Sequence, residues 1–126
     1  MTGVVLVALG GGVGAALRYL VGVGATRLFG PVFPVGTMTV NVLGSFAMGI
    51  LVAWLAARAG EGQATLTRLL ATGFLGGFTT FSSFSLDAVA LWERGQDGLA
   101  MLYVGGSVAL ALAGIVAGLA VGRAIL

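Results

Sequence analysis

The sequence predicts an all-α integral membrane protein with four transmembrane helices. Hydrophobic residues make up 59% of its 126 residues and charged residues only 8%, whereas ordinary soluble domains contain about 25% charged residues. The mean hydropathy of +1.12 agrees with this class. Small soluble domains bury only part of their surface, so a chain this short must expose much apolar area to the lipid bilayer. Its length allows a single domain, residues 1–126.

Four long segments with little charge predict helices at about residues 2–27, 34–57, 67–93 and 98–123. A helix rises about 1.5 Å per residue, so each segment can cross a hydrocarbon core of roughly 30 Å. The segments are separated only by short breaks, which predicts tight loops between neighbouring spans.

The first two segments are separated by the turn sequence FGPVFP. Arg18 is the one charge between residues 2 and 26, and MTGVVLVALGGG lacks the basic start of a cleaved signal peptide, so we expect a retained span. Pro34 favours the first turn of a helix, and residues 35–57 after it are uncharged. We therefore expect the second span to begin at this proline.

The last two segments are bounded by the most polar stretches of the chain. ARAGEGQATLTR precedes the third segment, and ERGQDG, a turn rich in charge and glycine, follows it. Asp87 is the one charge between residues 69 and 92, and residues 99–122 carry none.

Small residues recur four apart in the first and last segments. Gly10 and Gly14 have this spacing, and so do Gly114, Gly118 and Gly122. In lipid, small residues at this spacing let two helix backbones approach closely. We expect these glycines to mark helix contacts.

The third segment contains TGFLGGFTTFSSFSLD, residues 72–87, which is an unusual sequence for a span. Gly73, Gly76 and Gly77 each cost about 1 kcal/mol relative to alanine in a helix, and Thr79 and Thr80 add β-branching, so we predict a break near residues 75–80. Irregular backbone inside a membrane is tolerated only where it is buried in protein or lines a wet cavity. Carbonyl groups freed by the break can bind a cation such as Na⁺.

Uncharged polar stripes run along the second and fourth segments. Asn41 lies midway along its span, with Thr37 and Ser45 four residues on either side and therefore on the same face. The fourth segment has Tyr103 and Ser107 at the same spacing. Polar side chains inside a membrane are costly and are often functional. Hydrogen bonding between helices is the alternative explanation.

A phenylalanine stripe follows the predicted break. Phe78, Phe81 and Phe84 are three residues apart and fall roughly on one helix face, beside the hydroxyls of Thr80 and Ser83. The positive edge of a phenyl ring attracts an anion, and its negative face attracts a cation. Core packing is the alternative explanation. A pathway of hydroxyls, an amide and ring edges, without a buried carboxylate, favours a small anion.

The arginines are balanced between the two sides of the membrane. On the side of both termini are Arg58, Arg68 and Arg123; on the other side are Arg27, Arg94 and, if it lies near that end, Arg18. Three against three gives the positive-inside rule almost no orientation bias. We therefore expect insertion both ways up and an antiparallel, dual-topology homodimer with a two-fold axis in the membrane plane.

Arg18 stands out as the cation inside a span. At a vestibule its field would concentrate anions, and snorkelling to the interface is the alternative. The other arginines are scattered, so no nucleic-acid patch is predicted.

Two other functions fit a small four-span chain. A proton-coupled exporter of the small multidrug type also inserts both ways up, but it needs a membrane-embedded Glu, and Glu61 and Glu93 lie in or beside loops. A membrane subunit without transport activity is the second alternative. An enzyme is not predicted, because the chain has no His, no Cys and no paired carboxylates.

Three motifs resemble those of the Fluc (CrcB) fluoride channel family. They are GGGVGAALRY at residues 10–19, GTMTVNVLGSF at residues 36–46 and GFLGGFTTFSSFS at residues 73–85. The likeness covers nearly the whole chain in length, span count and motif order, and the third motif is the most specific. It implies a dual-topology homodimer in the cell (inner) membrane that exports fluoride passively through two antiparallel pores. The resemblance, and not the spacing, implies fluoride rather than chloride.

The resemblance also implies site residues. The anion pathway falls on Asn41, Phe81, Phe84, Thr80, Ser83, Tyr103, Ser107 and Arg18. A structural Na⁺ at the dimer interface falls on the backbone carbonyls of Gly76 and Thr79. The acidic residue after the phenylalanine motif is Glu in the family, and here it is Asp87, whose shorter side chain makes it a lesser candidate.

Overall fold

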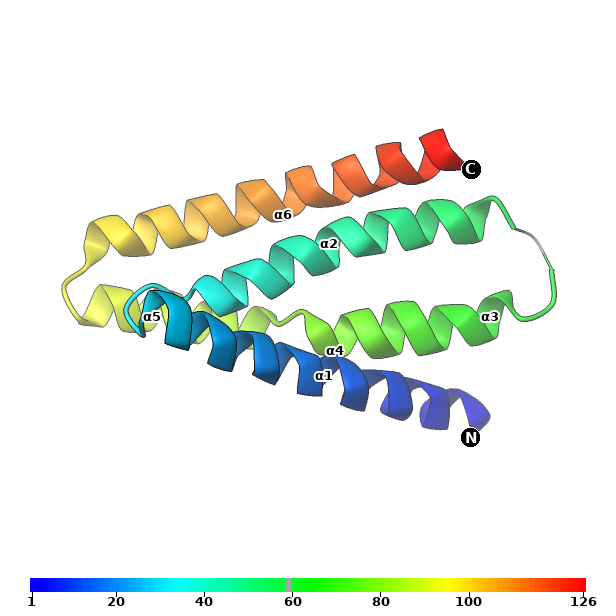
Figure 1. The fold of residues 1–126 in the computed structure, drawn as a ribbon, viewed down its shortest axis with the longest axis horizontal. Coiled ribbons are helices and arrows are strands. Elements are labelled where there is room, and N and C mark those ends of the chain that lie inside the picture. The colour runs from blue at the N-terminus through cyan, green and yellow to red at the C-terminus, as the bar shows by residue number, and fades with distance from the viewer. Residues whose placement is uncertain (59) are drawn as a thin grey trace.

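The structure, a computed structural model, describes residues 1–58 and 60–126, which are helical apart from short connections. Four helical runs are long and apolar enough to cross a membrane. They are α1 (Thr2–Phe29), α2 (Val35–Ala56), the third run (Gln63–Glu93) and α6 (Asp97–Ile125). Figure 1 shows the four runs alongside one another, so the predicted class of four transmembrane helices is confirmed.

The third run consists of several pieces. They are α3 (Gln63–Leu66), the π-helical segment η1 (Thr67–Leu75), α4 (Gly76–Phe78) and, after two extended residues, α5 (Phe81–Glu93). The run starts at Gln63 rather than at about residue 67, because the Gln63 side chain donates from Nε2 to the Leu55 carbonyl oxygen over 2.9 Å. This bond fixes the first turn against the end of α2.

The break in the third run lies at Thr79 and Thr80. Their backbones are extended, with φ −87° and ψ 156° at Thr79 and φ −153° and ψ 119° at Thr80. The break therefore falls inside the predicted interval, residues 75–80. Of its two predicted causes, the β-branched threonines mark its position and the glycines do not. Gly76 is helical, with φ −62° and ψ −36°. The chain leaves the helix at two β-branched residues, which favour extended backbone.

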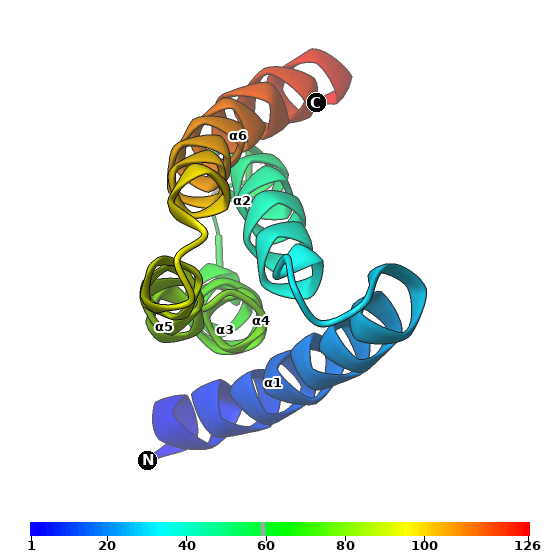
Figure 2. The ribbon, with the colours of Figure 1, turned by 90° about the vertical axis from the view of Figure 1, so that its left-hand side faces the viewer.

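The glycines of the third run instead let α1 pack closely against it. A Cβ on Gly14 would overlap the Phe74 carbonyl oxygen, and one on Gly77 would overlap the Gly11 carbonyl oxygen. Figure 2 shows α1 lying across the third run, with which it makes extensive contact. Helix approach therefore explains Gly73 and Gly77, whereas Gly76 is exposed and its Cβ position meets no atom of α1.

α2 and α6 form the other closely packed pair. A Cβ on Gly118 would overlap the Phe46 carbonyl oxygen, and one on Gly49 would overlap the Ile115 carbonyl oxygen. The small-residue spacing predicted to mark helix contacts in the first and last segments is confirmed for both pairs of helices.

Substitution of Gly118 by valine tests this contact. Gly118→Val is expected to lower the melting temperature of the detergent-solubilised protein, because overpacking against backbone costs about 1–3 kcal/mol. Gly105→Val on the same helix is the matched control, since nothing lies within 4 Å of a Cβ there. Thermal unfolding followed by circular dichroism compares the variants, and equal melting temperatures would contradict the assigned contact.

The charged ends of the bundle are not equivalent. Both chain termini and the connection between α2 and α3 lie at one end (Figure 1). At the other end, Arg94 donates from Nη2 to the Val32 carbonyl oxygen over 3.3 Å and joins the two remaining connections. Arg18 does not lie at that end, because its Nε donates over 3.0 Å to the carbonyl oxygen of Gly77, midway along the third run. The count of end arginines is therefore three against two.

Little apolar surface is buried within one chain. Val40, Leu91 and Tyr103 are the largest fully buried side chains, whereas many large apolar side chains on all four runs are exposed. Such a surface requires lipid or another apolar protein face as its surroundings.

Candidate functional site

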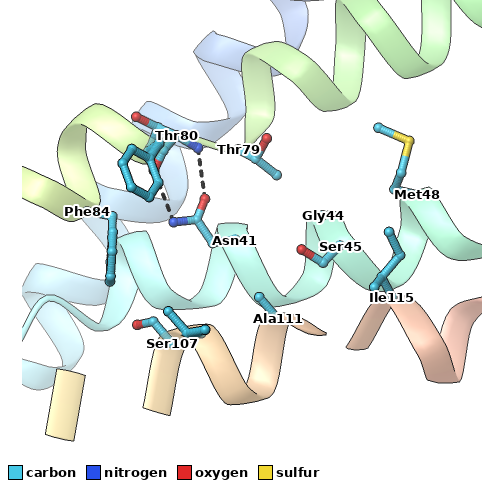
Figure 3. Close-up of a pocket in the computed structure, with 12 residues that line it drawn as sticks. Asn41, Gly44, Ser45, Met48, Thr79, Thr80, Phe84, Ser107, Ala111 and Ile115 are labelled. Carbon is cyan, nitrogen blue, oxygen red and sulfur yellow. Dashed lines mark hydrogen bonds between the residues drawn. The ribbon is translucent and has the colours of Figure 1, made fainter. Parts of the chain in front are cut away.

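The break in the third run is held by a side chain from α2. Asn41 donates from Nδ2 to the Thr80 carbonyl oxygen over 3.1 Å, and Asn41 Oδ1 accepts from the Thr80 amide over 2.8 Å (Figure 3). The break leaves the N–H and C=O groups of Thr80 without helical partners, and the Asn41 carboxamide supplies the hydrogen bonds that neighbouring peptide groups would otherwise make. Thr80 also caps α5, since its Oγ1 accepts from the Ser83 amide over 3.2 Å. These bonds explain why extended backbone is stable inside an apolar bundle.

On the other side of the break, the last carbonyl groups of α4 lack helical partners. The Gly77 carbonyl oxygen accepts from Arg18. The Leu75 carbonyl oxygen accepts from the Thr79 amide over 3.0 Å and from the Thr79 hydroxyl over 2.9 Å. This bond uses the hydrogen of the Thr79 hydroxyl, so the hydroxyl lone pairs and the main-chain carbonyl of Thr79 are both chemically suited to a cation. Gly76, the other residue expected at the Na⁺ site, is exposed.

A groove of about 310 Å³ lies beside the break, where α2, α5 and α6 meet (Figure 3). Five predicted pathway residues line it: Asn41, Thr80, Phe81, Phe84 and Ser107. The other lining residues are Gly44, Ser45, Met48, Thr79, Val108, Ala111 and Ile115. Among the residues that the structure describes, none of those lining this uncharged groove is acidic or basic.

Ser107 is the buried polar residue of the uncharged groove. It is 4% exposed, and its Oγ has no hydrogen-bond partner within the described chain. Buried hydroxyls without a partner are rare in folded proteins, so each needs an explanation such as a water or an ion. Its orphaned hydroxyl supports the prediction that Ser107 contacts a ligand.

Two phenylalanines face the uncharged groove. The Phe81 and Phe84 ring centroids are 5.6 Å apart with the planes tilted by 46°. Phe81 is 78% exposed, whereas Phe84 is half-buried and lies 5.2 Å from the Tyr103 ring. The prediction that Phe78 shares a face with Phe81 and Phe84 is wrong. Phe78 precedes the break and stacks on Phe74, with ring centroids 6.0 Å apart. The extended residues reset the helical phase, so spacing across them does not place side chains on one face.

A second groove, of about 540 Å³, is cationic. It brings together Arg18, Thr80 and Ser83 with Tyr19, Gly22, Val23, Thr26, Arg27, Gly36 and Thr37. Thr80 lines both grooves, so the cationic groove and the uncharged groove are neighbours. Hydrogen bonding to Gly77 fixes Arg18 here, which disfavours the alternative of snorkelling.

Tyr103 lies apart from both grooves in the part of the chain that is described. It is fully buried, and its hydroxyl donates to Asp87 Oδ2 over 3.2 Å. Asp87 lines a third cavity, of about 180 Å³, together with Thr26 and Thr37. Tyr103 is therefore not brought to the groove with Ser107, and the pair it forms with Asp87 was not predicted. The sequence contained one indication of this pair, because Asp87 is the single acidic residue inside a span.

The polar stripe predicted on α2 divides between the two grooves. Asn41 and Ser45 line the uncharged groove, whereas Thr37 lines the cationic groove. Ser45 is thus a groove residue that the predicted pathway did not include, although its spacing from Asn41 indicated the shared face. Ser85 instead donates to the Phe81 carbonyl oxygen over 2.9 Å, the usual bond of a hydroxyl within its own helix.

Residues 5–119 match the family model described as CrcB-like protein, Camphor Resistance (CrcB). The chain is 62% identical over 117 residues to the fluoride-specific ion channel FluC of Cereibacter sphaeroides, covering 93% of this chain and 91% of that protein. It is 54% identical over 120 residues to FluC of Rhizobium etli, covering 95% of each chain. It is 51% identical over 123 residues to FluC of Caulobacter vibrioides, covering 98% and 97%. These relatives are named as channels and not as enzymes, in agreement with the sequence-based expectation.

Proposed function

The chain belongs to the CrcB-like family, and from this premise we propose that it is a fluoride-selective channel that exports fluoride passively across the cell membrane. Export would lower the cytoplasmic fluoride level. The observation that carries the proposal is the uncharged groove beside the break, lined by an amide, hydroxyls and two phenylalanines. It occurs in a chain 62% identical to a protein named a fluoride-specific ion channel.

Neutral donors suit an anion that must both enter and leave. A carboxamide has two N–H donors; the Thr80 carbonyl takes one from Asn41, and the other remains for an anion. Ser107 carries an O–H without a protein partner in the described residues. Such donors replace part of a hydration shell without the trap of a full opposite charge. The positive ring edges of Phe81 and Phe84 also attract the anion, but more weakly than the N–H and O–H donors.

Arg18 supplies the attraction at the mouth of the pathway. A guanidinium has five N–H donors, and its Nε bond to Gly77 leaves the terminal nitrogens for the cationic groove. A fixed positive charge in a cleft raises the local concentration of anions. Anions gathered there would pass Thr80, which lines both grooves, to reach Asn41 and the phenylalanines.

The proposed working unit is an antiparallel homodimer in the cell (inner) membrane, crossed four times by each copy. Arg58, Arg68 and Arg123 against Arg27 and Arg94 give only a weak orientation bias. Phe81 is largely exposed in one chain, so another surface has to separate the pathway from lipid. Two copies related by an axis in the membrane plane would hold two antiparallel pores.

A structural Na⁺ on that axis would be held by the carbonyls of Gly76 and Thr79 from both copies. Carbonyl oxygens are suitable donors for Na⁺, as at other broken membrane helices. Support comes from the break itself, which ends the helical stretch 63–78 and leaves carbonyl groups at the negative end of its dipole. Within the described residues, clusters of His, Cys, Asp or Glu that could hold a metal are absent.

Replacing Na⁺ tests the cation site. Purification in N-methylglucamine at equal ionic strength is expected to lower the melting temperature of the dimer, and returning Na⁺ should restore it. A ligand at a hundred times its Kd stabilises by about 3 kcal/mol. K⁺ at the same concentration is the control for a general salt effect. A melting temperature that does not respond to Na⁺, or responds equally to K⁺, would argue against the site.

Ion efflux from liposomes containing the purified protein tests the function. We expect rapid, voltage-driven release of fluoride, little release of chloride, and no need for a proton gradient. Equal chloride release would remove the selectivity. Dependence on a proton gradient would favour the small multidrug type of exporter, and the absence of any ion release would favour a subunit without transport activity.

A further inference from the structure

Two backbone amides at the break are hydrogen-bonded to side-chain oxygens. In an uninterrupted helix, each amide donates to the carbonyl oxygen four residues earlier. The Thr80 amide would then donate to Gly76, but it donates over 2.8 Å to Asn41 Oδ1 (Figure 3). The Ser83 amide would donate to Thr79, but it donates over 3.2 Å to Thr80 Oγ1. Side-chain oxygens thus bind both amides in place of the backbone carbonyls.

The two carbonyls that lose their helical donors in this way belong to Gly76 and Thr79, the pair expected to bind Na⁺. Two other carbonyls at the break accept hydrogen bonds from elsewhere. The Leu75 oxygen accepts from the amide and the hydroxyl of Thr79, and the Gly77 oxygen accepts from Arg18 over 3.0 Å. The hydrogen bonds at the break therefore distinguish the expected cation ligands from two of their neighbours.

Each of the two amides has two possible acceptors. Without the Asn41 oxygen, the part-buried Thr80 amide would lack an acceptor unless the chain returned to a helical turn and donated to Gly76. An unpaired buried amide is costly, so loss of the side-chain oxygen favours the helical turn. The Ser83 amide has the same choice, between Thr80 Oγ1 and the Thr79 carbonyl. In a helical turn, both carbonyls would be bound by amides.

We propose that the side-chain oxygens of Asn41 and Thr80 position the cation site without touching the cation. By binding the two amides, they leave the carbonyls of Gly76 and Thr79 free for Na⁺. The inference rests on the Na⁺ site of the proposed function and adds to it two positioning residues. It also separates the two ends of the Asn41 carboxamide, since the nitrogen faces the proposed anion pathway and the oxygen supports the cation site.

A Na⁺ titration of the melting temperature tests the Asn41 oxygen. The purified, detergent-solubilised protein is melted at increasing Na⁺, with N-methylglucamine keeping the ionic strength constant and K⁺ as the control for a general salt effect. Asn41→Ala is expected to raise the Na⁺ concentration for half-maximal stabilisation about tenfold, because removing groups that orient metal ligands typically costs about 10–100-fold in affinity. Asn41→Asp keeps an oxygen for the Thr80 amide, so it should need no more Na⁺ than the wild type.

Thr80 supplies the second test in the same titration. Thr80→Val removes the hydroxyl and should also raise the half-maximal Na⁺ concentration about tenfold, whereas Thr80→Ser keeps the hydroxyl and should restore the wild-type value. Thr67→Val is the matched control, because it removes a hydroxyl that donates over 2.9 Å to the Gln63 carbonyl oxygen in the same run. It should lower the melting temperature and leave the Na⁺ concentration unchanged.

The Na⁺ concentration for half-maximal stabilisation, and not the melting temperature itself, decides the inference. Wild-type values in Asn41→Ala and Thr80→Val would overturn it, and an equal rise in Thr67→Val would overturn it as well. A rise in Asn41→Asp equal to that in Asn41→Ala would show that the oxygen is not the responsible group. A wild-type protein without a Na⁺ response would instead overturn the cation site of the proposed function, while fluoride efflux tests the channel separately.

Discussion

Asn41→Asp is expected to reduce fluoride efflux at neutral pH by about a thousandfold. Asn41 lines the uncharged groove beside the break, so the substitution places a negative charge on the proposed anion pathway. Two like charges about 4 Å apart repel by about 4 kcal/mol at an effective dielectric constant of 20, which is about three powers of ten in occupancy. Efflux from liposomes at equal protein content measures the loss, and size-exclusion chromatography verifies the dimer.

Lowering the pH distinguishes the effect of the added charge on efflux from the effect of losing the amide. A carboxylic acid is neutral below its pKa and charged above it, so Asn41→Asp should recover activity as the pH falls. The neutral acid can also donate to the Thr80 carbonyl oxygen, as Asn41 does. Asn41→Ala is the control, because it removes the donor without adding a charge and should lose less activity, with no recovery at low pH. Equal, pH-independent losses in both variants would show that the charge is not the cause; protein-free liposomes correct for leakage of HF.

Phe81→Ile is expected to slow fluoride efflux by about tenfold while leaving the dimer intact. The ring lines the uncharged groove and is 78% exposed within one chain, so its packing inside the subunit is slight. The loss is that of the positive ring edge. The same edge contributes about 0.5–1.5 kcal/mol in pairs of aromatic rings, and a loss of that size for an anion corresponds to up to about tenfold. Initial efflux rates at saturating fluoride measure the effect.

Phe78→Ile is the matched control for the phenylalanine test. The same substitution is made three residues earlier, where the ring stacks on Phe74 and lines neither groove. Its efflux should stay near the wild-type rate, and its melting temperature should fall because packing is lost. The reverse pattern, with Phe81→Ile conducting normally and Phe78→Ile conducting slowly, would show that the ring before the break has the role in conduction.

Several features of the site follow from particular residues of the sequence. Asn41 was predicted either to be functional or to form a hydrogen bond between helices, and the structure shows such a bond to the Thr80 backbone, 39 residues away. The spacing of Asn41 and Ser45 correctly placed both on one face of α2. Within one uninterrupted helix, residue spacing is enough to predict which side chains share a face.

Predictions that crossed the break or joined separate helices were less successful. Phe78 was expected on one face with Phe81, but the extended residues between them interrupt the helix and reset its phase. Arg18 was counted with the end arginines only if it lay near that end, and this condition is not met, because the Gly77 carbonyl at the break binds it midway along the third run. The partner of Tyr103, Asp87, lies on another helix and no spacing rule connects the two.

By itself, the sequence determined the membrane class, the number of spans and the glycine-mediated helix contacts, because composition and periodicity along one helix follow directly from residue order. Tertiary structure alone decided that the third run leaves the helix at Thr79 and Thr80 and not at its glycines. The physical reason is that Gly73 and Gly77 are packed in helical form against α1, while Asn41 of α2 satisfies the exposed peptide groups of Thr80. Both contacts exist only after the helices have packed.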